Sequence, residues 1–391
     1  MDTMLTQSPA FFTAEDCRVE DLAALCARSL TPAEVPLATE VAKNIPLYDA
    51  ARLAPMLADG TARRGLLAEW ARVLMQGAGV FVIRGAYADT SALDRSTEIY
   101  LNIIAAERAA NGVAADHFGK AGSNDRIWNS LQKLCEADPE TYARCFGNPY
   151  MQAACEAWLG PNYQMTAQVN LVHPGGAAQL AHRDYHLGFQ TADLSAQYPA
   201  HVHDLSPVLT LQGAIAHCDM SVESGPTKLL PFSQAYRAGY AAWRLPAFRT
   251  YFEENFVQLP LSKGDAIFFN PALLHAAGTN RTTNVERFVN LVQVSSAFGR
   301  AMETVDRQKM CTLLYPVLLR GISGFSVSQI DAAIASTAEG YSFPTNLDRD
   351  PPVGGLAPET QAALMRRALA AHMAPDAFTA ALEALATRQR A

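Results

Sequence analysis

The stretch that decides the fold is Asn170-Leu-Val-His-Pro-Gly-Gly-Ala-Ala-Gln-Leu-Ala-His-Arg-Asp184. It leaves an apolar run of strand-forming residues, turns at Pro174-Gly-Gly176 and ends in the pattern His-x-Asp. Residues i and i+2 of an extended strand face the same side, so His182 and Asp184 can both bind one ion. We therefore expect a β core that carries a metal ion on its wall.

The His-x-Asp pattern is weak evidence by itself, because His217-Cys-Asp219 repeats it. The second copy lies where a strand runs into a turn, so we expect His217 to fill the core and Asp219 to fix that turn. A third ligand should come from a distant strand, and His275 ends another apolar run. Two imidazoles and one carboxylate form the facial triad typical of Fe(II) oxygenases, which leaves three coordination positions open.

Short apolar runs fill the middle of the chain, from about Asn162 to Ser296, and turns of Gly, Pro, Asn and Asp separate them. This spacing is typical of an antiparallel barrel or jelly roll. The predicted strands are Gly79–Arg84, Gln164–Val172, Val208–Ala216, Lys228–Pro231, Ala266–Phe269 and Arg287–Val294.

Helical patterns flank this region on both sides. The predicted helices include Leu66–Met75, Ala92–Glu107, Cys311–Leu319 and Val327–Ala338. We therefore predict a mainly β core with α extensions, in one catalytic domain overall. Residues 1–160 would form a helical region with one or two core strands, 161–300 the catalytic core, and 301–391 a helical extension.

The composition is that of an ordinary globular chain, with 391 residues, 49% hydrophobic, 18% charged and a net charge of −7. Basic tracts and apolar runs of about 18 residues do not occur, so we expect neither a nucleic-acid partner nor a membrane span. Met1–Ala14 does not resemble a secretory signal, which favours a cytoplasmic location. Seven cysteines without a CxxC pair indicate free thiols rather than disulfides or a structural zinc site.

Three segments together resemble the phytanoyl-CoA dioxygenase family. They are Ala178-Gln-Leu-Ala-His-Arg-Asp184, Glu223-Ser-Gly-Pro-Thr-Lys-Leu-Leu-Pro231 and Gly264-Asp265 with the later His275 and Arg287. The resemblance covers roughly Asn162 to Ser296, and it implies a double-stranded β-helix, or jelly roll. It also implies an oxygenase that depends on iron(II) and uses 2-oxoglutarate as cosubstrate together with O2.

The resemblance implies a role for six residues. Those matching His182, Asp184 and His275 bind iron, and Arg287 matches the arginine that binds the far carboxylate of 2-oxoglutarate. Gln179 and Thr227 match residues that contact its other carboxylate, although each could instead close a turn with a hydrogen bond. Arg281 competes with Arg287, but it lies in a turn-like segment, whereas strand alternation places Arg287, Val289 and Leu291 on one face.

These observations predict a dioxygenase that oxidises a C–H bond of a small metabolite or natural-product intermediate, most simply by hydroxylation, and releases succinate and CO2. Because Asp184 keeps a carboxylate on the metal, we do not expect halogenation. Two other classes stay open: a cupin-like metal-dependent hydrolase or isomerase, and a non-catalytic β-barrel binding protein. The sequence does not determine the oligomeric state, and a homodimer is compatible with it.

Other histidines offer weaker candidates. The segment 189–207 resembles an inserted loop, and its His201 and His203 could form a second metal site, although exposed loop histidines are commoner. His186 could line the pocket or make a hydrogen bond in the core.

Overall fold

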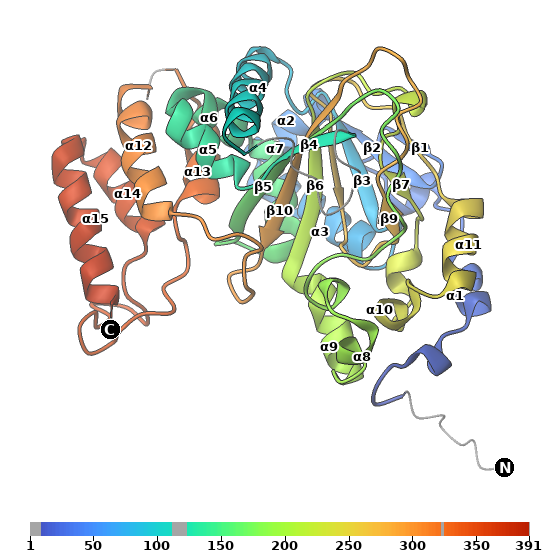
Figure 1. Cartoon of the computed structure of the whole chain (residues 1–391). Helices are drawn as coiled ribbons and strands as arrows, with labels where there is room; N and C mark the ends of the chain where they lie inside the picture. The colour runs from blue at the N-terminus through green and yellow to red at the C-terminus, as the bar shows by residue number, and fades with distance from the viewer. Residues whose placement is uncertain (1–8, 112–122, 322–323, 391) are drawn as a thin grey trace.

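The computed structural model describes residues 9–111, 123–321 and 324–390. Its centre is an eight-stranded sheet in the order β1-β2-β3-β8-β6-β10-β5-β4 (Figure 1). Neighbouring strands are antiparallel except for the parallel pair β2 and β3. The strands are Glu40–Ala42 (β1), Ile45–Asp49 (β2), Val80–Arg84 (β3), Asn124–Ile127 (β4), Gln164–Val172 (β5), Thr210–Ala216 (β6), Ala266–Phe269 (β8) and Arg287–Ser295 (β10).

A small second sheet pairs Lys228–Leu229 (β7) with His275–Ala276 (β9). Single bridges widen it on both sides, because His182 pairs with His275 and Leu229 pairs with Val257. Residues of both sheets line one cavity, so the two sheets enclose it between them. The fold is therefore a jelly-roll core with helical extensions, as the sequence predicted.

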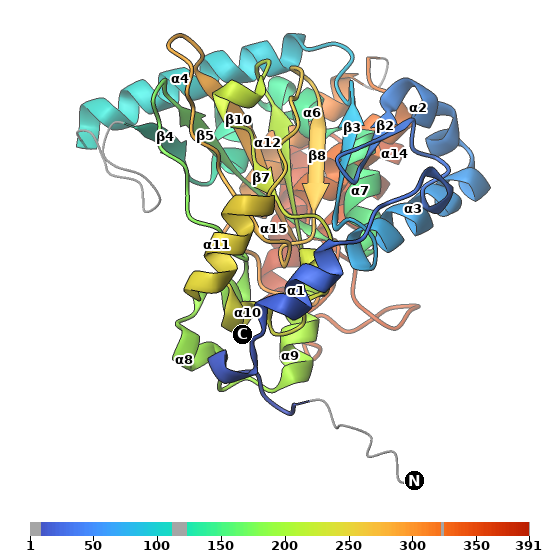
Figure 2. The same ribbon diagram turned by 90° about the vertical axis from the view of Figure 1, so that its right-hand side faces the viewer.

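Helices precede, interrupt and follow the sheet. They are Val19–Cys26 (α1), Ala50–Ala58 (α2), Gly60–Met75 (α3), Ser91–Asn111 (α4), Ser130–Ala137 (α5), Pro139–Phe146 (α6), Pro149–Leu159 (α7), Ala192–Ser195 (α8), Ala200–Leu205 (α9), Gly239–Ala242 (α10), Pro246–Asn255 (α11), Arg307–Arg320 (α12), Val327–Thr337 (α13), Gln361–Ala370 (α14) and Pro375–Gln389 (α15). Figure 2 shows α1, α10 and α11 together on the side of the molecule away from α12–α15. No helix among the described residues is long and apolar enough to cross a membrane.

Local sequence explains where the helices behind the sheet begin. Asp138 accepts hydrogen bonds from the backbone of Glu140 and Thr141, and Pro139 occupies the first position of α6. Asn148 does the same for α7, which Pro149 opens. An acceptor side chain followed by proline satisfies free N–H groups and presets the helical backbone.

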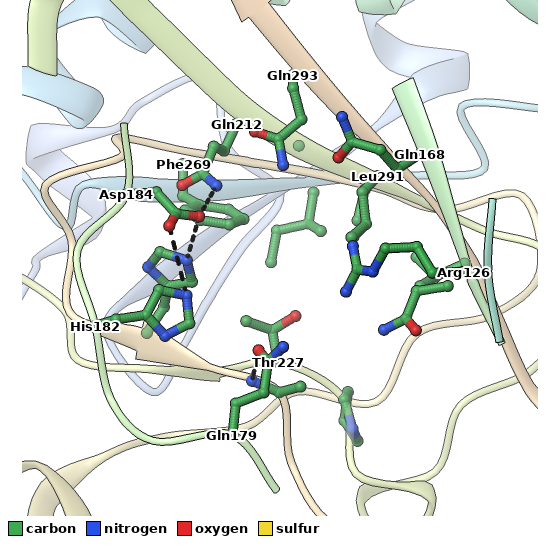
Figure 3. Close-up of a pocket in the computed structure, with 18 of the residues that line it drawn as sticks. Arg126, Gln168, Gln179, His182, Asp184, Gln212, Thr227, Phe269, Leu291 and Gln293 are labelled. Atoms are coloured by element: carbon green, nitrogen blue, oxygen red, sulfur yellow. Dashed lines mark hydrogen bonds and ion pairs between the residues drawn. The ribbon is translucent and has the colours of Figure 1, made fainter. Parts of the chain in front are cut away.

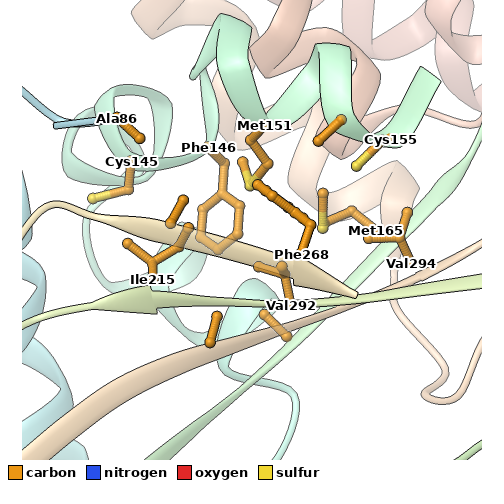
Figure 4. Close-up of a cluster of buried hydrophobic side chains, with 14 of the residues drawn as sticks. Ala86, Cys145, Phe146, Met151, Cys155, Met165, Ile215, Phe268, Val292 and Val294 are labelled. Atoms are coloured by element: carbon orange, nitrogen blue, oxygen red, sulfur yellow. The ribbon is translucent and has the colours of Figure 1, made fainter. Parts of the chain in front are cut away.

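Strand alternation gives the main sheet two different faces. Figure 4 shows Ile215, Phe268 and Val292 of three adjacent strands packed with Phe146 and Met151 of α6 and α7. The opposite face of the same strands lines the cavity. The helices thus bury the outer face of the sheet and leave the inner face for the site.

The structure corrects the prediction for residues 1–160, which contain four strands of the main sheet rather than one or two. β1 and β2 form a hairpin whose turn residues Lys43 and Asn44 both have positive φ. The turn lacks glycine and β1 has only three residues, so no sequence signal marked the hairpin. β4 pairs with β5 at the far edge of the sheet.

Residues 189–207 also differ from the predicted loop. The segment folds into the short helices α8 and α9 with 3₁₀ turns beside them. Phe12 and Tyr240 both make ring contacts with His203, which lies in α9. The segment is therefore part of the packed structure.

The C-terminal helices belong to the main hydrophobic core, which contains residues from Leu30 to Leu385. Tyr315 of α12 and Phe378 of α15 stack with ring centroids 4.0 Å apart. All seven cysteines are free, as the sequence predicted, and four of them are buried. The division at residues 160 and 300 stays a prediction, although the shared core supports a single domain.

Candidate metal centre and its pocket

Two side chains of one extended segment, His182 and Asp184 (Figure 3), converge with His275 of β9 on the wall of the cavity. The Nε2 of His182 lies 3.7 Å from Oδ1 of Asp184, and the Nε2 of His275 lies 3.5 Å from Oδ2 of the same carboxylate. All three ligand atoms lie within 4.8 Å of one another. The bridge between His182 and His275 brings the two sequence-distant histidines together, which the sequence alone could not measure.

Backbone carbonyls fix which nitrogen of each imidazole faces the cluster. The Nδ1 of His182 lies 2.8 Å from the carbonyl oxygen of Leu180, and the Nδ1 of His275 lies 2.8 Å from that of Leu273. A proton on Nδ1 donates to the carbonyl and leaves a lone pair on Nε2. Burial also lowers the pKa of His182, which favours the neutral imidazole that a metal requires.

The Asp184 carboxylate is held from several sides. Its Oδ2 accepts a 2.5 Å hydrogen bond from Nε2 of Gln212, and its backbone N–H donates to the carbonyl of Pro271. Burial opposes its charge, but the attraction of the two imidazoles in their protonated form and the hydrogen bond from Gln212 outweigh burial and keep its pKa below the usual range. The carboxylate is therefore ionised.

This donor set fits iron(II). It offers two imidazole nitrogens and one carboxylate close to a common point on the wall of the cavity. Such a triad suits non-haem Fe(II) and keeps positions open for exogenous ligands. Among the described residues it is the only group of three such ligands close enough to hold one ion.

A second feature of the cavity is the guanidinium of Arg287, the first residue of β10. Its Nη1 donates to the carbonyl oxygens of Ser224 and Gly278, at 3.2 and 3.0 Å. No carboxylate in the described part of the chain pairs with Arg287, and burial lowers its pKa to about 10. A buried cation without an anion on the wall of a cavity is prepared to receive an anionic group.

Comparison with known proteins identifies the family. The model of the family described as phytanoyl-CoA dioxygenase matches residues 75–289, which is more than half of the chain and includes both histidines, Asp184 and Arg287. The chain belongs to the phytanoyl-CoA dioxygenase family. Membership of this family favours a dioxygenase that uses iron(II) and 2-oxoglutarate, and the cluster of His182, Asp184 and His275 suits the iron. The family membership favours a dioxygenase over the predicted alternatives of a metal-dependent hydrolase or isomerase and a non-catalytic binding protein.

Individual relatives match only part of the chain. Dioxygenase andF of Emericella variicolor is 30% identical over 157 residues, which cover 38% of this chain and 48% of the relative. Dioxygenase trt7 of Aspergillus terreus is 27% identical over 139 residues, 36% of this chain and 43% of the relative. The chain thus spans about half the length of the curated relatives it matches.

Solved structures show more distant likeness. The crystal structure of SnoN, a non-haem α-ketoglutarate-dependent epimerase from nogalamycin biosynthesis, has a TM-score of 0.39 and 19% identity over 61% of this chain and 84% of that one. AviO1 from Streptomyces viridochromogenes has a TM-score of 0.43 and 17% identity over 59% of this chain and 96% of that one.

The other two residues predicted to contact 2-oxoglutarate in this member of the phytanoyl-CoA dioxygenase family also lie at the cavity. Gln179 and Thr227 both line it. The Oε1 of Gln179 accepts a hydrogen bond from the backbone N–H of Ala277, so this side chain joins two segments that are distant in the chain and does not close a local turn. Arg281 is exposed and does not line the cavity, which supports Arg287 over Arg281.

The other histidines lie outside the cluster. His217 is buried between Tyr100 and Phe288, and its Nδ1 lies 2.9 Å from Oγ1 of Thr97. Asp219 accepts from the backbone of Lys263 and so fixes a turn, as expected.

The predicted insertion holds no second metal site among the described residues. His201 is exposed, His203 is buried with its Nε2 near the carbonyl of Ser195, and His186 lies near the hydroxyl of Ser206.

Sequence reasoning missed most of the polar residues that line the cavity around the cluster. They lie on β4, β5, β6 and β10 and just beyond β4: Arg126, Trp128, Gln168, Asn170, Gln212 and Gln293. Alternation marks Gln168 and Asn170 as sharing one face of β5. Without knowing which face is internal, the sequence could not assign them to the pocket.

Proposed function

We propose that this dioxygenase hydroxylates a C–H bond of a small-molecule substrate, with iron(II) held by His182, Asp184 and His275. The observation that carries the proposal is the convergence of these three side chains on a cavity that also contains an unpaired, buried Arg287. Iron(II), 2-oxoglutarate and O2 supply the oxidising chemistry, in which one oxygen atom enters the substrate and 2-oxoglutarate leaves as succinate and CO2.

The protein's own part is to orient and to bind. The carbonyls of Leu180 and Leu273 hold the imidazoles with Nε2 toward the ion, and Gln212 holds the carboxylate of Asp184. These outer contacts reduce the rearrangement that metal binding would otherwise need.

At the other end of the cosubstrate site, Arg287 binds the far carboxylate of 2-oxoglutarate. Its planar guanidinium can donate two parallel hydrogen bonds, and its position on a strand limits its movement. Thr227 and Gln179 line the same cavity as Arg287 and the cluster, and they would contact the other carboxylate.

The product is hydroxylated, or else desaturated or rearranged, and not halogenated. The Asp184 carboxylate takes the coordination position that a halide would need. Mass spectrometry of turnover under ¹⁸O₂ checks this, since hydroxylation adds one labelled oxygen. A chlorinated product would contradict it.

The central test is anaerobic reconstitution with iron(II), followed by measurement of bound iron and of succinate release. We expect His182→Ala combined with His275→Ala to remove the iron and the turnover together, because two of three ligands are lost. Full iron occupancy in the double variant would overturn the assignment. His217→Ala is the matched control, because it removes a buried histidine from the core and should leave the iron bound.

A further inference from the structure

Three glutamines form a row across the inner face of the main sheet. Gln168 lies on β5, Gln212 on β6 and Gln293 on β10, the strand between them. Gln212 and Gln293 are direct partners in the register, and Gln168 faces Leu291, so it lies diagonally from Gln293. Figure 3 shows the three amides along one wall of the cavity, with Gln212 next to Asp184. We call Gln168, Gln212 and Gln293 the glutamine row.

The glutamine row is buried and incompletely hydrogen-bonded. The exposed fractions of Gln168, Gln212 and Gln293 are 0%, 4% and 7%. In each of them the Oε1 atom is buried and has no hydrogen-bond partner among the described residues. A buried acceptor without a donor costs on the order of 1–3 kcal/mol. Three such atoms on one wall of one cavity therefore point to a ligand that supplies donors.

The chemistry of the neighbours fixes which amide atom is left over. The Nε2 of Gln212 donates to Asp184, and the Nε2 of Gln168 donates to Oε2 of Glu303 at 3.0 Å. In each case the amide nitrogen faces a carboxylate oxygen, which accepts the hydrogen bond, so the amide oxygen is the atom without a partner. The remaining atoms of Gln168 and Gln212 are therefore acceptors, and the missing partner must be a donor.

Charge indicates what kind of donor fits. The cavity lining contains the guanidinium groups of Arg126 and Arg287 and the single carboxylate of Asp184. With 2-oxoglutarate on Arg287, an ammonium group would still meet the guanidinium of Arg126 in a poorly solvated space, whereas a hydroxyl group donates without charge. The cavity also has an apolar part, lined by Leu261, Ile267 and Phe269, which suits the carbon skeleton of a ring.

We propose that the glutamine row is the substrate subsite, and that the substrate is a neutral, ring-containing molecule recognised through several hydroxyl groups. This inference rests on the proposed function, because it assigns the space beyond the cosubstrate to the molecule that is oxidised. The row adjoins the iron ligand Asp184 through Gln212, so hydroxyl groups bound there hold the neighbouring carbons close to the metal centre.

The test measures binding to the anaerobic holoenzyme with iron(II) and 2-oxoglutarate, by calorimetry and by the fluorescence of Trp128, which lines the cavity. The probes are hydroxylated rings, from methyl hexopyranosides to fused-ring triols, each paired with its fully O-methylated counterpart. We expect at least one hydroxylated probe to bind. Its O-methylated partner should bind at least about 10-fold more weakly. Gln168→Leu and Gln293→Leu should each weaken the hydroxylated probe by about 3- to 10-fold.

Gln197→Leu is the matched control, because Gln197 is exposed and should leave binding unchanged. The paired probes on the unaltered enzyme test the inference even where a variant folds poorly. The inference is overturned if no hydroxylated probe binds, if O-methylation has no effect, or if both leucine variants bind as the unaltered enzyme does. Failure to bind 2-oxoglutarate in the first titration would instead contradict the proposed function.

Discussion

Arg287 shows at the scale of one residue how burial without a partner identifies a binding group. Its guanidinium is held by two backbone carbonyls, which fix its position without neutralising its charge. Arg281 lies six residues earlier and is exposed, with only its backbone N–H bonded to the carbonyl of Glu223. The two arginines therefore give a matched pair for mutation.

We predict that Arg287→Ala raises the 2-oxoglutarate concentration needed for half-maximal turnover by about 30- to 1000-fold. A charge-assisted bidentate pair in a partly dry pocket contributes roughly 2–4 kcal/mol, which corresponds to that range. Calorimetric titration of 2-oxoglutarate into the iron(II) enzyme gives the same comparison without turnover. Arg281→Ala should change little, and the reverse pattern would exchange the two assignments.

His217 leads to a prediction about stability and pH. Burial lowers its pKa from 6.5 to about 3, so the folded protein keeps it neutral while the unfolded chain protonates. Its contribution is complete above the unfolded pKa and is lost as the pH falls from 6.5 toward 3. His217→Gln should therefore make the free energy of unfolding fall less steeply with decreasing pH, by about 1.4 kcal/mol per pH unit.

Urea unfolding at several pH values between 7 and 4 checks this prediction about His217. His201→Gln is the control, because His201 is exposed on α9 and its replacement should leave the slope unchanged. Equal slopes for the unaltered protein and His217→Gln would show that His217 does not carry the effect.

The sequence distinguished the two His-x-Asp patterns at this scale, because their flanking turns differ. The structure brings His182 and Asp184 together with His275 and places His217 in the core. The glutamine row could not be predicted from the sequence. On a strand that is buried on both faces, apolar residues flank an inward and an outward glutamine alike. The iron-binding role of the two histidines and Asp184 and the cosubstrate-binding role of Arg287 stay predictions.

Two turns hold Arg287 at the scale of elements. One contains Ser224 and Gly225, the other Gly278 and Thr279, and their backbones touch. Gly225 has φ +75°, and a Cβ there would lie 2.3 Å from the carbonyl oxygen of Thr279. Glycine at this position therefore allows both turns to present carbonyls to the same guanidinium.

We predict that Gly225→Ala lowers the free energy of unfolding by about 1–3 kcal/mol more than Gly354→Ala. Gly354 has a similar φ of +71°, but a Cβ there meets nothing within 4 Å, so it controls for the backbone conformation alone. Gly225→Ala should also weaken 2-oxoglutarate binding, because the turn must move away from Arg287. Urea unfolding and calorimetry check the two effects, and equal losses for both variants would contradict the clash.

Strands with strong apolar character were predicted well, and weak ones were not. β5 and β8 have the predicted bounds, whereas β6 begins at Thr210 because residues 206–209 form a 3₁₀ turn. β1 and β4 are edge strands, three and four residues long, whose pairing depends on neighbours far away in the chain. Short edge strands bury little, so their sequences carry little of the alternation that prediction uses.

The whole molecule shares one core, and this has a consequence for how it unfolds. Phe378 of α15 is fully buried and stacks on Tyr315 of α12, in the same cluster as Trp70 near the opposite end of the chain. If the C-terminal helices were a separate domain, damage there would leave the rest of the protein unaffected.

We predict that Phe378→Ala lowers the stability of the entire chain by about 3–5 kcal/mol in one transition. All four tryptophans precede residue 244, so their fluorescence reports on the rest of the molecule, while far-ultraviolet circular dichroism reports on all helices. Both signals should shift together. Early loss of helix with an unchanged fluorescence midpoint would divide the chain into two domains, and Leu356→Ala, which is fully exposed, is the control.

The inward positions of β10 suggest how this enzyme could be redesigned. Arg287 stands at one end of the strand and Gln293 at the other, with Val289 and Leu291 between them on the same face. The backbone ladder fixes their spacing, so exchange of Leu291 and Gln293 leaves the arginine in place. A variant library confined to those two positions would then change which compounds are accepted while every member still consumes the same cosubstrate.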